Sequence, residues 1–286
     1  MGPLRVRSLI VSRRFALAPL HLALLAGAAL ALLPFFWMVS TSLKTQAEVY
    51  TYPPIWLPFP PHLENYVDAL SFRPFGLFFR NTLAIAIAVI IGDILSCSMV
   101  GYGFARLKFP GRDTLFVVLL ATIMMPFIVR LVPLFVLFQQ FGWINTLLPL
   151  IIPAYFGTPF FIFLVRQFFL TIPADLSDAA RIDGASELAI WWRVMMPLSG
   201  PVMAVITILA FQQVWSDFLA PLVFLSDQSV RTLALGLHSM LDLNSAAQPY
   251  HWLMAVSSAM VLPVLLLFIA FQRLFVQGVV MSGIKG

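Results

Sequence analysis

Long stretches without a single charged residue recur along this chain, and they constrain its fold more than any other feature. No Asp, Glu, Lys or Arg occurs from Phe15 to Leu43 or from Leu131 to Val165. In the whole sequence 61% of the residues are hydrophobic and 10% are charged, against about 45–50% and about 25% in soluble domains. Too few charged side chains remain to cover a surface in water, which excludes soluble globular, disordered and nucleic-acid-binding classes. We therefore expect lipid to surround the chain.

The uncharged stretches predict six membrane-spanning helices. One helical span needs roughly 20 mostly apolar residues, and the run 131–165 joined to the apolar run before it is long enough for two spans. A polar turn that contains Gly142 separates these two spans. The expected spans are 17–41, 79–105, 114–138, 147–169, 199–221 and 252–273. The predicted fold class is therefore all-α, a polytopic membrane protein.

The basic residues that flank the spans predict the orientation of the chain. Twelve of the 17 Lys and Arg residues fall on one side if the N-terminus is cytoplasmic, namely Arg5, Arg7, Arg13, Arg14, Arg106, Lys108, Arg112, Arg166, Arg181, Arg193, Arg273 and Lys285. By the positive-inside rule we expect an inner-membrane protein with both termini in the cytoplasm. An alternative reading makes the first span a cleaved signal peptide, but its apolar stretch exceeds the about 7–15 residues of such a segment.

The loops and spans suggest three parts of the chain. We expect an N-terminal segment with the first helix and a proline-rich external loop at 1–78, a five-helix core at 79–273, and a cytoplasmic tail at 274–286. The final external loop, 226–250, is polar enough to stand in water. The single cysteine, Cys97, rules out a disulfide within the chain, and the four scattered His residues form no metal-binding spacing.

A cytoplasmic loop at 172–196 carries the most informative pattern. Pro173 suits the first turn of a helix, and Leu176, Ala179, Ala180 and Asp183 share one helical face at spacings of three and four. The small alanines would let a partner approach the backbone closely, and the glycine that follows permits a sharp change of direction. The plain alternative is a solvated connecting loop.

The segment Asp178-Ala179-Ala180, followed three residues later by Gly184 and then by Met196-Pro197-Leu198, resembles the EAA loop of binding-protein-dependent ABC importer permeases. The chain has Asp178 where that pattern has Glu, which keeps the charge but shortens the reach by one methylene. The likeness extends along nearly the whole chain to the carbohydrate-uptake branch of the family, the maltose-permease G-type subunits. Further pieces that carry it are Ser42-Leu43-Lys44-Thr45, Glu64-Asn65-Tyr66, Asn81-Thr82, Gly142 with Asn145-Thr146, and Trp215-Ser216-Asp217.

This resemblance implies a type I importer permease of the MetI-like fold with a coupling helix that docks on a cytoplasmic ATPase. The implied coupling residues are Asp178, Ala179, Ala180, Asp183, Gly184 and Ala185. The tail, with Gly283 and Lys285, would contact the same ATPase, although Lys285 serves equally well as a positive-inside anchor. The implied partners are a second permease subunit in a heterodimer, two ATPase subunits and an extracytoplasmic binding protein, which the final external loop would reach. ATP and Mg would be bound by the ATPase, because this sequence has no phosphate-binding loop.

Three ionisable residues fall within or beside the predicted spans, where such groups are candidates for function. Asp93 lies mid-span, Arg130 near the outer half of the third span, and Asp217 near the outer end of the fifth. Arg130 would line the translocation path and favour an anionic solute, pair with an acid of the partner subunit, or extend toward the interface. For Asp217 the resemblance favours a structural or gating role.

Two other classes of protein fit the sequence less well. A secondary transporter has internal repeats and buried acid networks, and here only two acids are candidates for burial. A membrane enzyme needs a cluster such as paired histidines with an acid, which is not seen in this sequence. Within the favoured class, the runner-up is an importer permease for a non-sugar solute such as a peptide or an osmolyte.

Overall fold

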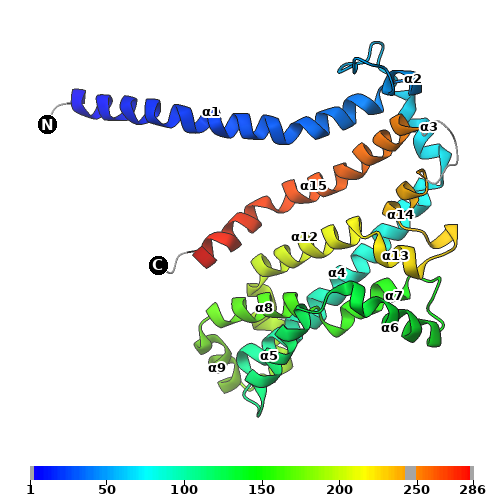
Figure 1. Cartoon of the computed structure of the whole chain (residues 1–286). Helices are drawn as coiled ribbons and strands as arrows, with labels where there is room; N and C mark the ends of the chain where they lie inside the picture. The colour runs from blue at the N-terminus through cyan, green and yellow to red at the C-terminus, as the bar shows by residue number, and fades with distance from the viewer. Residues whose placement is uncertain (1–2, 242–248, 284–286) are drawn as a thin grey trace. The chain divides into compact units, whose positions relative to one another are not determined.

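The computed structural model describes residues 3–241 and 249–283, with side chains for 19–241 and 249–272, and the elements it describes are helical (Figure 1). They divide between two compact units. The smaller unit comprises residues 1–72 and 245–261, and the larger comprises 73–244 and 262–286. The all-α class predicted from the sequence is confirmed.

The smaller unit is organised around the end of the first long helix, α1 (Pro3–Ser42). The short α2 (Gln46–Val49) begins with a capping box between Thr45 and Glu48. From α3 (Glu64–Phe72), the amide of Asn65 donates to the carbonyls of Ser42 at 2.9 Å and Lys44 at 2.8 Å. Asn65, from one of the sequence motifs, therefore fixes by hydrogen bonds the backbone of the Ser42–Lys44 motif at the end of α1.

Helix α4 (Phe75–Arg106) is the centre of the larger unit. It packs against α8 (Pro159–Thr171), α12 (Gly200–Ser216) and the turns before α8, which are α7 (Leu148–Ile151) and the 3₁₀ turn η1 (Ile152–Phe156). The buried core between them consists of aliphatic and aromatic side chains such as Ile85, Val165, Phe169 and Ile206. This core fixes the cytoplasmic loop on α4, because the loop joins two of the helices that pack there.

The close approach of α4 and α8 depends on Gly101. A Cβ atom at this position would lie 2.8 Å from Val165 Cγ1 and 3.3 Å from the backbone nitrogen of Arg166. We expect Gly101→Leu to lower the free energy of unfolding by about 1–3 kcal/mol, because overpacking forces the backbones apart. Thermal unfolding in detergent measures the effect. Gly103→Leu is the matched control, since nothing lies within 4 Å of a Cβ there, and equal unfolding temperatures for both variants would contradict the close packing.

The third predicted span is broken, so the expectation of one continuous helix over 114–138 is wrong. Helix α5 (Arg112–Ile123) and helix α6 (Phe127–Gln140) meet at an angle of 97°. Pro126 lies at the break with extended backbone (φ −59°, ψ 142°). It has no N–H to continue the helix, and its ring disfavours helical backbone at the preceding residue.

The other spans follow the prediction with shifted ends. Among the described residues, four helical segments are long and apolar enough to cross a membrane: Pro19–Ser42, Phe75–Arg106, Leu148–Thr171 and Tyr250–Gln272. Two bent pairs of helices also pass this test when each pair is taken together. One is α5 with α6, and the other is Glu187–Leu198 with Gly200–Ser216, which is bent by 80°. Six crossings thus require that each bent pair counts as one. The fifth span ends at Ser216, not at 221, and α15 (Tyr250–Gly283) extends past 273.

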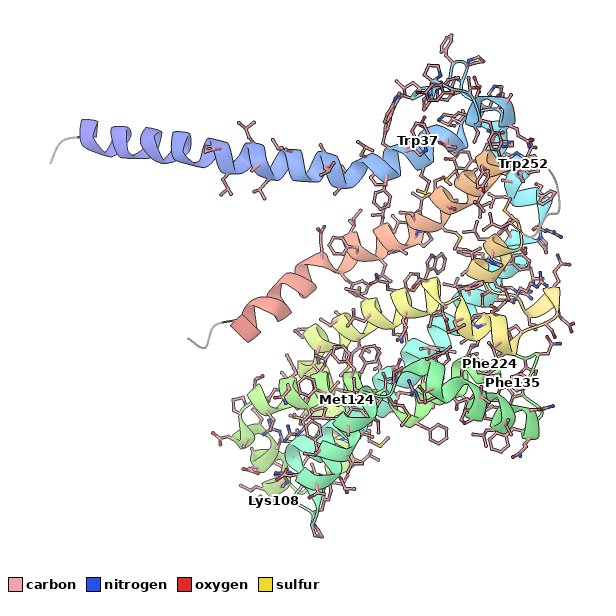
Figure 2. All side chains as sticks on the ribbon, viewed as in Figure 1. Trp37, Lys108, Met124, Phe135, Phe224 and Trp252 are labelled. Carbon is pink, nitrogen blue, oxygen red and sulfur yellow. The ribbon has the colours of Figure 1, made fainter. Side chains whose placement is uncertain are left out.

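The described part of the final external loop is more buried than expected. After α13 (Leu219–Phe224), it forms η3 (Gln228–Val230) and α14 (Leu233–His238), and α14 packs on α4 with Leu233 and Leu235 buried. Phe224 of α13 lies in a small apolar cluster with Phe135 of α6 (Figure 2). Residues 226–229 are exposed, as expected of a loop that stands in water, but that expectation is wrong for residues 232–240, because α14 packs its apolar side chains on α4.

Candidate functional site

The loop at 172–196 forms a sharp elbow between α9 (Ala174–Ile182) and α10 (Glu187–Ile190). Gly184 has φ +81°, which glycine adopts readily. Its N–H donates to Arg181 at 3.0 Å, and the N–H of Ala185 donates to Ala180 at 2.9 Å, so the helix ends in a Schellman-type turn. Ser186 then caps α10 by accepting from the N–H of Ala189 at 3.3 Å. Local sequence therefore dictates the elbow that the pattern predicted.

The exposed face of α9 contains most of the residues expected to share it. Leu176 is exposed, Ala180 is half-buried at the edge of the core, and Ser177 on the opposite side is 1% exposed. Ile182 is 87% exposed, and Ala179 and Asp183 lie exposed near it. The elbow thus presents a large aliphatic side chain that no other described residue covers.

An exposed ion-pair network joins the two helices of the elbow. Arg181 Nε and Nη2 donate to the two carboxylate oxygens of Glu187 at 2.7 and 3.2 Å, and Arg181 Nη1 donates to Asp178 Oδ1 at 2.6 Å. Hydrogen bonding to Glu187 raises the pKa of Arg181 above its usual value. The hydroxyl of Tyr102, on α4, donates to Glu187 Oε2. Asp178, predicted as a coupling residue, therefore belongs to a network that reaches α4.

Two further arginines make hydrogen bonds between the helices that flank the elbow. Arg106, at the end of α4, donates from Nη2 to the carbonyl of Phe169 at 2.8 Å and to that of Ile172. Arg166 of α8 donates to the carbonyl of Phe104 at 3.3 Å and lies over the ring of Phe116. Sequence reasoning counted both arginines only as orientation signals and missed Tyr102. The sequence signal that could have identified these three residues is their position toward the ends of apolar helices that flank the loop at 172–196.

Side-chain amides of Asn81 and Asn145 restrain the segment that follows α13. Asn145, with φ +64°, accepts from the N–H groups of Ser226 at 3.1 Å and Asp227 at 2.9 Å, and it donates to the Asp227 carboxylate. Asn81 of α4 donates to the carbonyls of Ser229 and Arg231 at 2.9 and 3.0 Å. Asn81 and Asn145 thus fix the backbone at the start of the final external loop by hydrogen bonds.

We expect Asn145→Gly to loosen this loop, since glycine keeps the positive φ but removes the amide bonds, each worth about 1 kcal/mol. Limited proteolysis at residues 225–231 should proceed at least about fivefold faster than in the unaltered chain. The control is Gln140→Gly, in an exposed position at the end of α6. Equal cleavage rates in the two variants would show that the amide does not restrain the loop.

The ionisable residues of the spans lie in three different settings. Asp93 is 2% exposed, and its Oδ1 accepts from the hydroxyl of Thr158 at 2.6 Å, so it joins α4 to the start of α8. Arg130 is exposed on α6, with its guanidinium carbon 5.9 Å from the centre of the Phe127 ring. Asp217 is half-buried and accepts from the N–H of Ala220 at 3.3 Å, where it caps α13. The structure does not bring these residues together.

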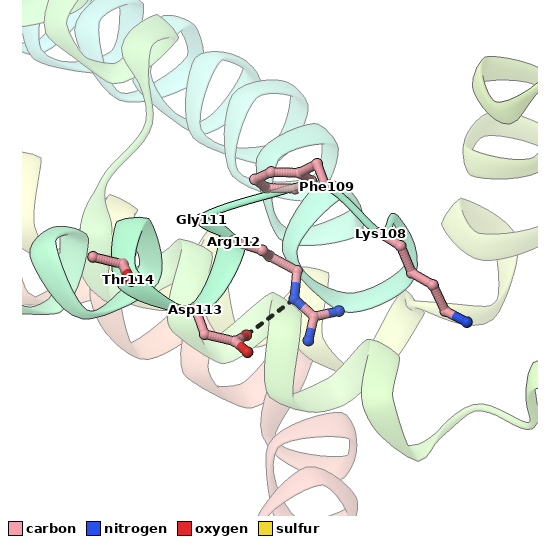
Figure 3. A pocket seen from close by; sticks show the side chains of 6 residues that line it. All are labelled: Lys108, Phe109, Gly111, Arg112, Asp113 and Thr114. Atoms are coloured by element: carbon pink, nitrogen blue, oxygen red, sulfur yellow. Dashed lines mark hydrogen bonds and ion pairs between the residues drawn. The ribbon is translucent and has the colours of Figure 1, made fainter.

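Two further regions were expected on the same side of the membrane as the elbow. Gly283 is the last residue of α15, and Lys285 lies outside the described residues. Between α4 and α5, Lys108, Arg112 and Asp113 line an open hollow of about 460 Å³ (Figure 3). Arg112 Nε donates to Asp113 Oδ1 at 3.0 Å there. None of the residues predicted for coupling lines this hollow.

Known proteins resemble the chain over most of its length. Residues 97–281 match the family described as "Binding-protein-dependent transport system inner membrane component". The arabinooligosaccharides transport system permease protein of Halalkalibacterium halodurans is 37% identical over 227 residues, 78% of this chain and 80% of that protein. The diacetylchitobiose uptake system permease protein of Streptomyces coelicolor is 34% identical over 262 residues, 91% of this chain and 86% of that protein.

A solved structure supports the fold. The crystal structure of a bacterial ABC transporter involved in the import of the acidic polysaccharide alginate contains a chain that matches with a TM-score of 0.81 and 23% identity. The match covers 93% of this chain and 98% of that one. The chain therefore belongs to the family of binding-protein-dependent transport system inner membrane components, the permease subunits of ABC importers, and it is a transport subunit and not an enzyme.

Proposed function

We propose that this chain pairs with a second, related permease subunit, forms half of a translocation path for a sugar or sugar-like solute, and couples that path to two cytoplasmic ATPase subunits. The observation that carries the proposal is the exposed Ile182 on an elbow between α8 and α12, two helices that pack directly on α4. A partner with an apolar cleft would bury this side chain, a gain of about 1.5–3 kcal/mol.

The orientation follows from the charges. With both termini in the cytoplasm, the elbow and the loop that holds Lys108 and Arg112 face the ATPase side, and the loop held by Asn81 and Asn145 faces the extracytoplasmic binding protein. Asp183, Gly184 and Ala185 would contact the ATPase together with the outer face of α9. ATP and Mg would be bound by the ATPase subunits, and the tail with Gly283 and Lys285 would lie along them.

The solute class rests on the relatives. The permease proteins that resemble this chain are named for arabinooligosaccharides, diacetylchitobiose and sulfoquinovosyl glycerol. A carbohydrate is therefore the favoured solute, and a non-sugar solute is the alternative within the same class. Arg130, exposed on α6, would favour an anionic sugar if it lines the path.

Purification of the assembled complex tests this function. The tagged chain, expressed with its neighbouring transport genes and extracted in mild detergent, is expected to bring down an ATPase and a second permease in fixed ratio. After reconstitution into vesicles, uptake of a labelled oligosaccharide should require both ATP and the binding protein. A chain that purifies alone and drives uptake with an ion gradient would instead support a secondary transporter.

A further inference from the structure

Side chains of α4 make hydrogen bonds to residues on both sides of the elbow. Where the loop begins, Arg106 donates to the backbone carbonyls of Phe169 and Ile172. Where the loop turns back, Tyr102 donates its hydroxyl to Glu187, which in turn holds Arg181 through two hydrogen bonds. Tyr102 and Arg106 are one helical turn apart, so they lie on the same side of α4. The elbow is thus tied to one helix by side chains that come from that helix.

The packing of α9 itself offers little else to transmit a movement. Its inward residues are small: Ser177 contacts the sulfur of Met195 at 3.9 Å, and Ala180 is only half-buried. Small side chains make few contacts and let a helix shift against its neighbours. The bidentate Arg181–Glu187 pair does constrain direction, because two parallel hydrogen bonds fix the guanidinium relative to the carboxylate.

We propose that Tyr102 is a positioning residue that passes movement of the elbow to α4, through Arg181 and Glu187. This inference rests on the proposed function, because it requires that an ATPase moves α9. The far end of α4 holds the external loop through Asn81 and Thr82, whose hydroxyl accepts from the N–H of Leu233 at 2.8 Å. Thr82 and Tyr102 are separated by about 30 Å along a helix that rises 1.5 Å per residue. Helix α4 therefore joins the ATPase side to the loop that would meet the binding protein.

The test uses the whole complex in vesicles, with Tyr102→Phe in this chain. Phenylalanine keeps the ring, which contacts Phe169 edge-on with centroids 6.4 Å apart, and removes only the hydroxyl. A hydrogen bond to a charged group is lost, which corresponds to about a tenfold effect. We expect ATP hydrolysis stimulated by the loaded binding protein to continue, while solute transported per ATP hydrolysed falls about tenfold.

The matched control is Tyr155→Phe, where the ring and not the hydroxyl lies against Gly92. It should transport as much solute per ATP as the unaltered complex. Glu187→Gln should reproduce the loss seen with Tyr102→Phe. The double variant should be no worse than the poorer single variant, because both changes interrupt the same contact.

The outcomes separate this inference from the proposed function. If the unaltered complex transports solute with ATP and Tyr102→Phe does so with the same yield per ATP, the role of Tyr102 is overturned and the proposed function stands. A lower yield of assembled complex with unchanged transport per ATP also overturns it, because that result marks a structural contact only. If the unaltered complex shows no ATP-dependent transport, the proposed function fails, and the relay fails with it.

Discussion

Replacing Gly184 by proline is expected to reduce solute transport at least about tenfold while the chain still inserts and assembles in the membrane. Proline fixes φ near −65°, whereas the elbow requires +81° at this position. The turn that ends α9 would open, and Arg181 and Glu187 would no longer meet. Uptake by reconstituted vesicles and thermal unfolding of the purified complex measure the two effects separately.

Gly184→Asn provides the matched control at the same residue. Asparagine adopts left-handed backbone more readily than other non-glycine residues, and this chain already has Asn145 at φ +64°. The asparagine variant should keep most of the transport. If proline were tolerated as well as asparagine, the elbow would not need its left-handed turn, and the coupling role proposed for it would be wrong.

Replacing Ile182 by glutamine is expected to weaken binding of the ATPase about ten- to a hundredfold. Ile182 is 87% exposed, and burial of such a side chain at an interface contributes about 1.5–3 kcal/mol. Glutamine is a good helix former, so α9 itself should persist. The affinity between the purified permease pair and the ATPase gives the effect directly.

Ile182→Val serves as the control, because it removes one methylene and keeps an apolar surface. Its loss of affinity should not exceed about fourfold, from about 0.8 kcal/mol for the methylene. Equal affinity of the glutamine variant and the unaltered chain would place the docking surface elsewhere on the cytoplasmic side, and the orientation of α9 would lose its functional meaning.

The elbow shows how far local sequence carries a prediction. Proline at 173 and glycine at 184 bound the helix, and both the helix and the turn are confirmed. The residues expected to share the outward face are largely exposed, with Ala180 half-buried at its edge. Helical spacing tells which residues share a face, but it could not show the contact of Glu187 with Tyr102, which lies 85 residues away in the chain.

The broken third span has a different cause. Hydropathy over 114–138 is high throughout, so a straight span was predicted, although Pro126 stood in its middle as a visible signal. A proline within an apolar run permits a kinked helix as well as a break, and in a membrane the choice depends on neighbours that satisfy the freed backbone groups. The 97° angle between α5 and α6 is therefore a property of the packed structure.

By itself, the sequence determined that the chain lies in a membrane, approximately where its apolar helices run, and to which family it belongs. Those properties depend on the transfer of apolar side chains from water and on short motifs, and both act over neighbouring residues. Only the tertiary structure decided the contact of Tyr102 with Glu187, the hydrogen bonds of Arg106 to the end of α8, and those of Asn81 and Asn145 to the final external loop. Each of these contacts joins residues far apart in the chain, and the packing of helices in the larger unit brings them within bonding distance.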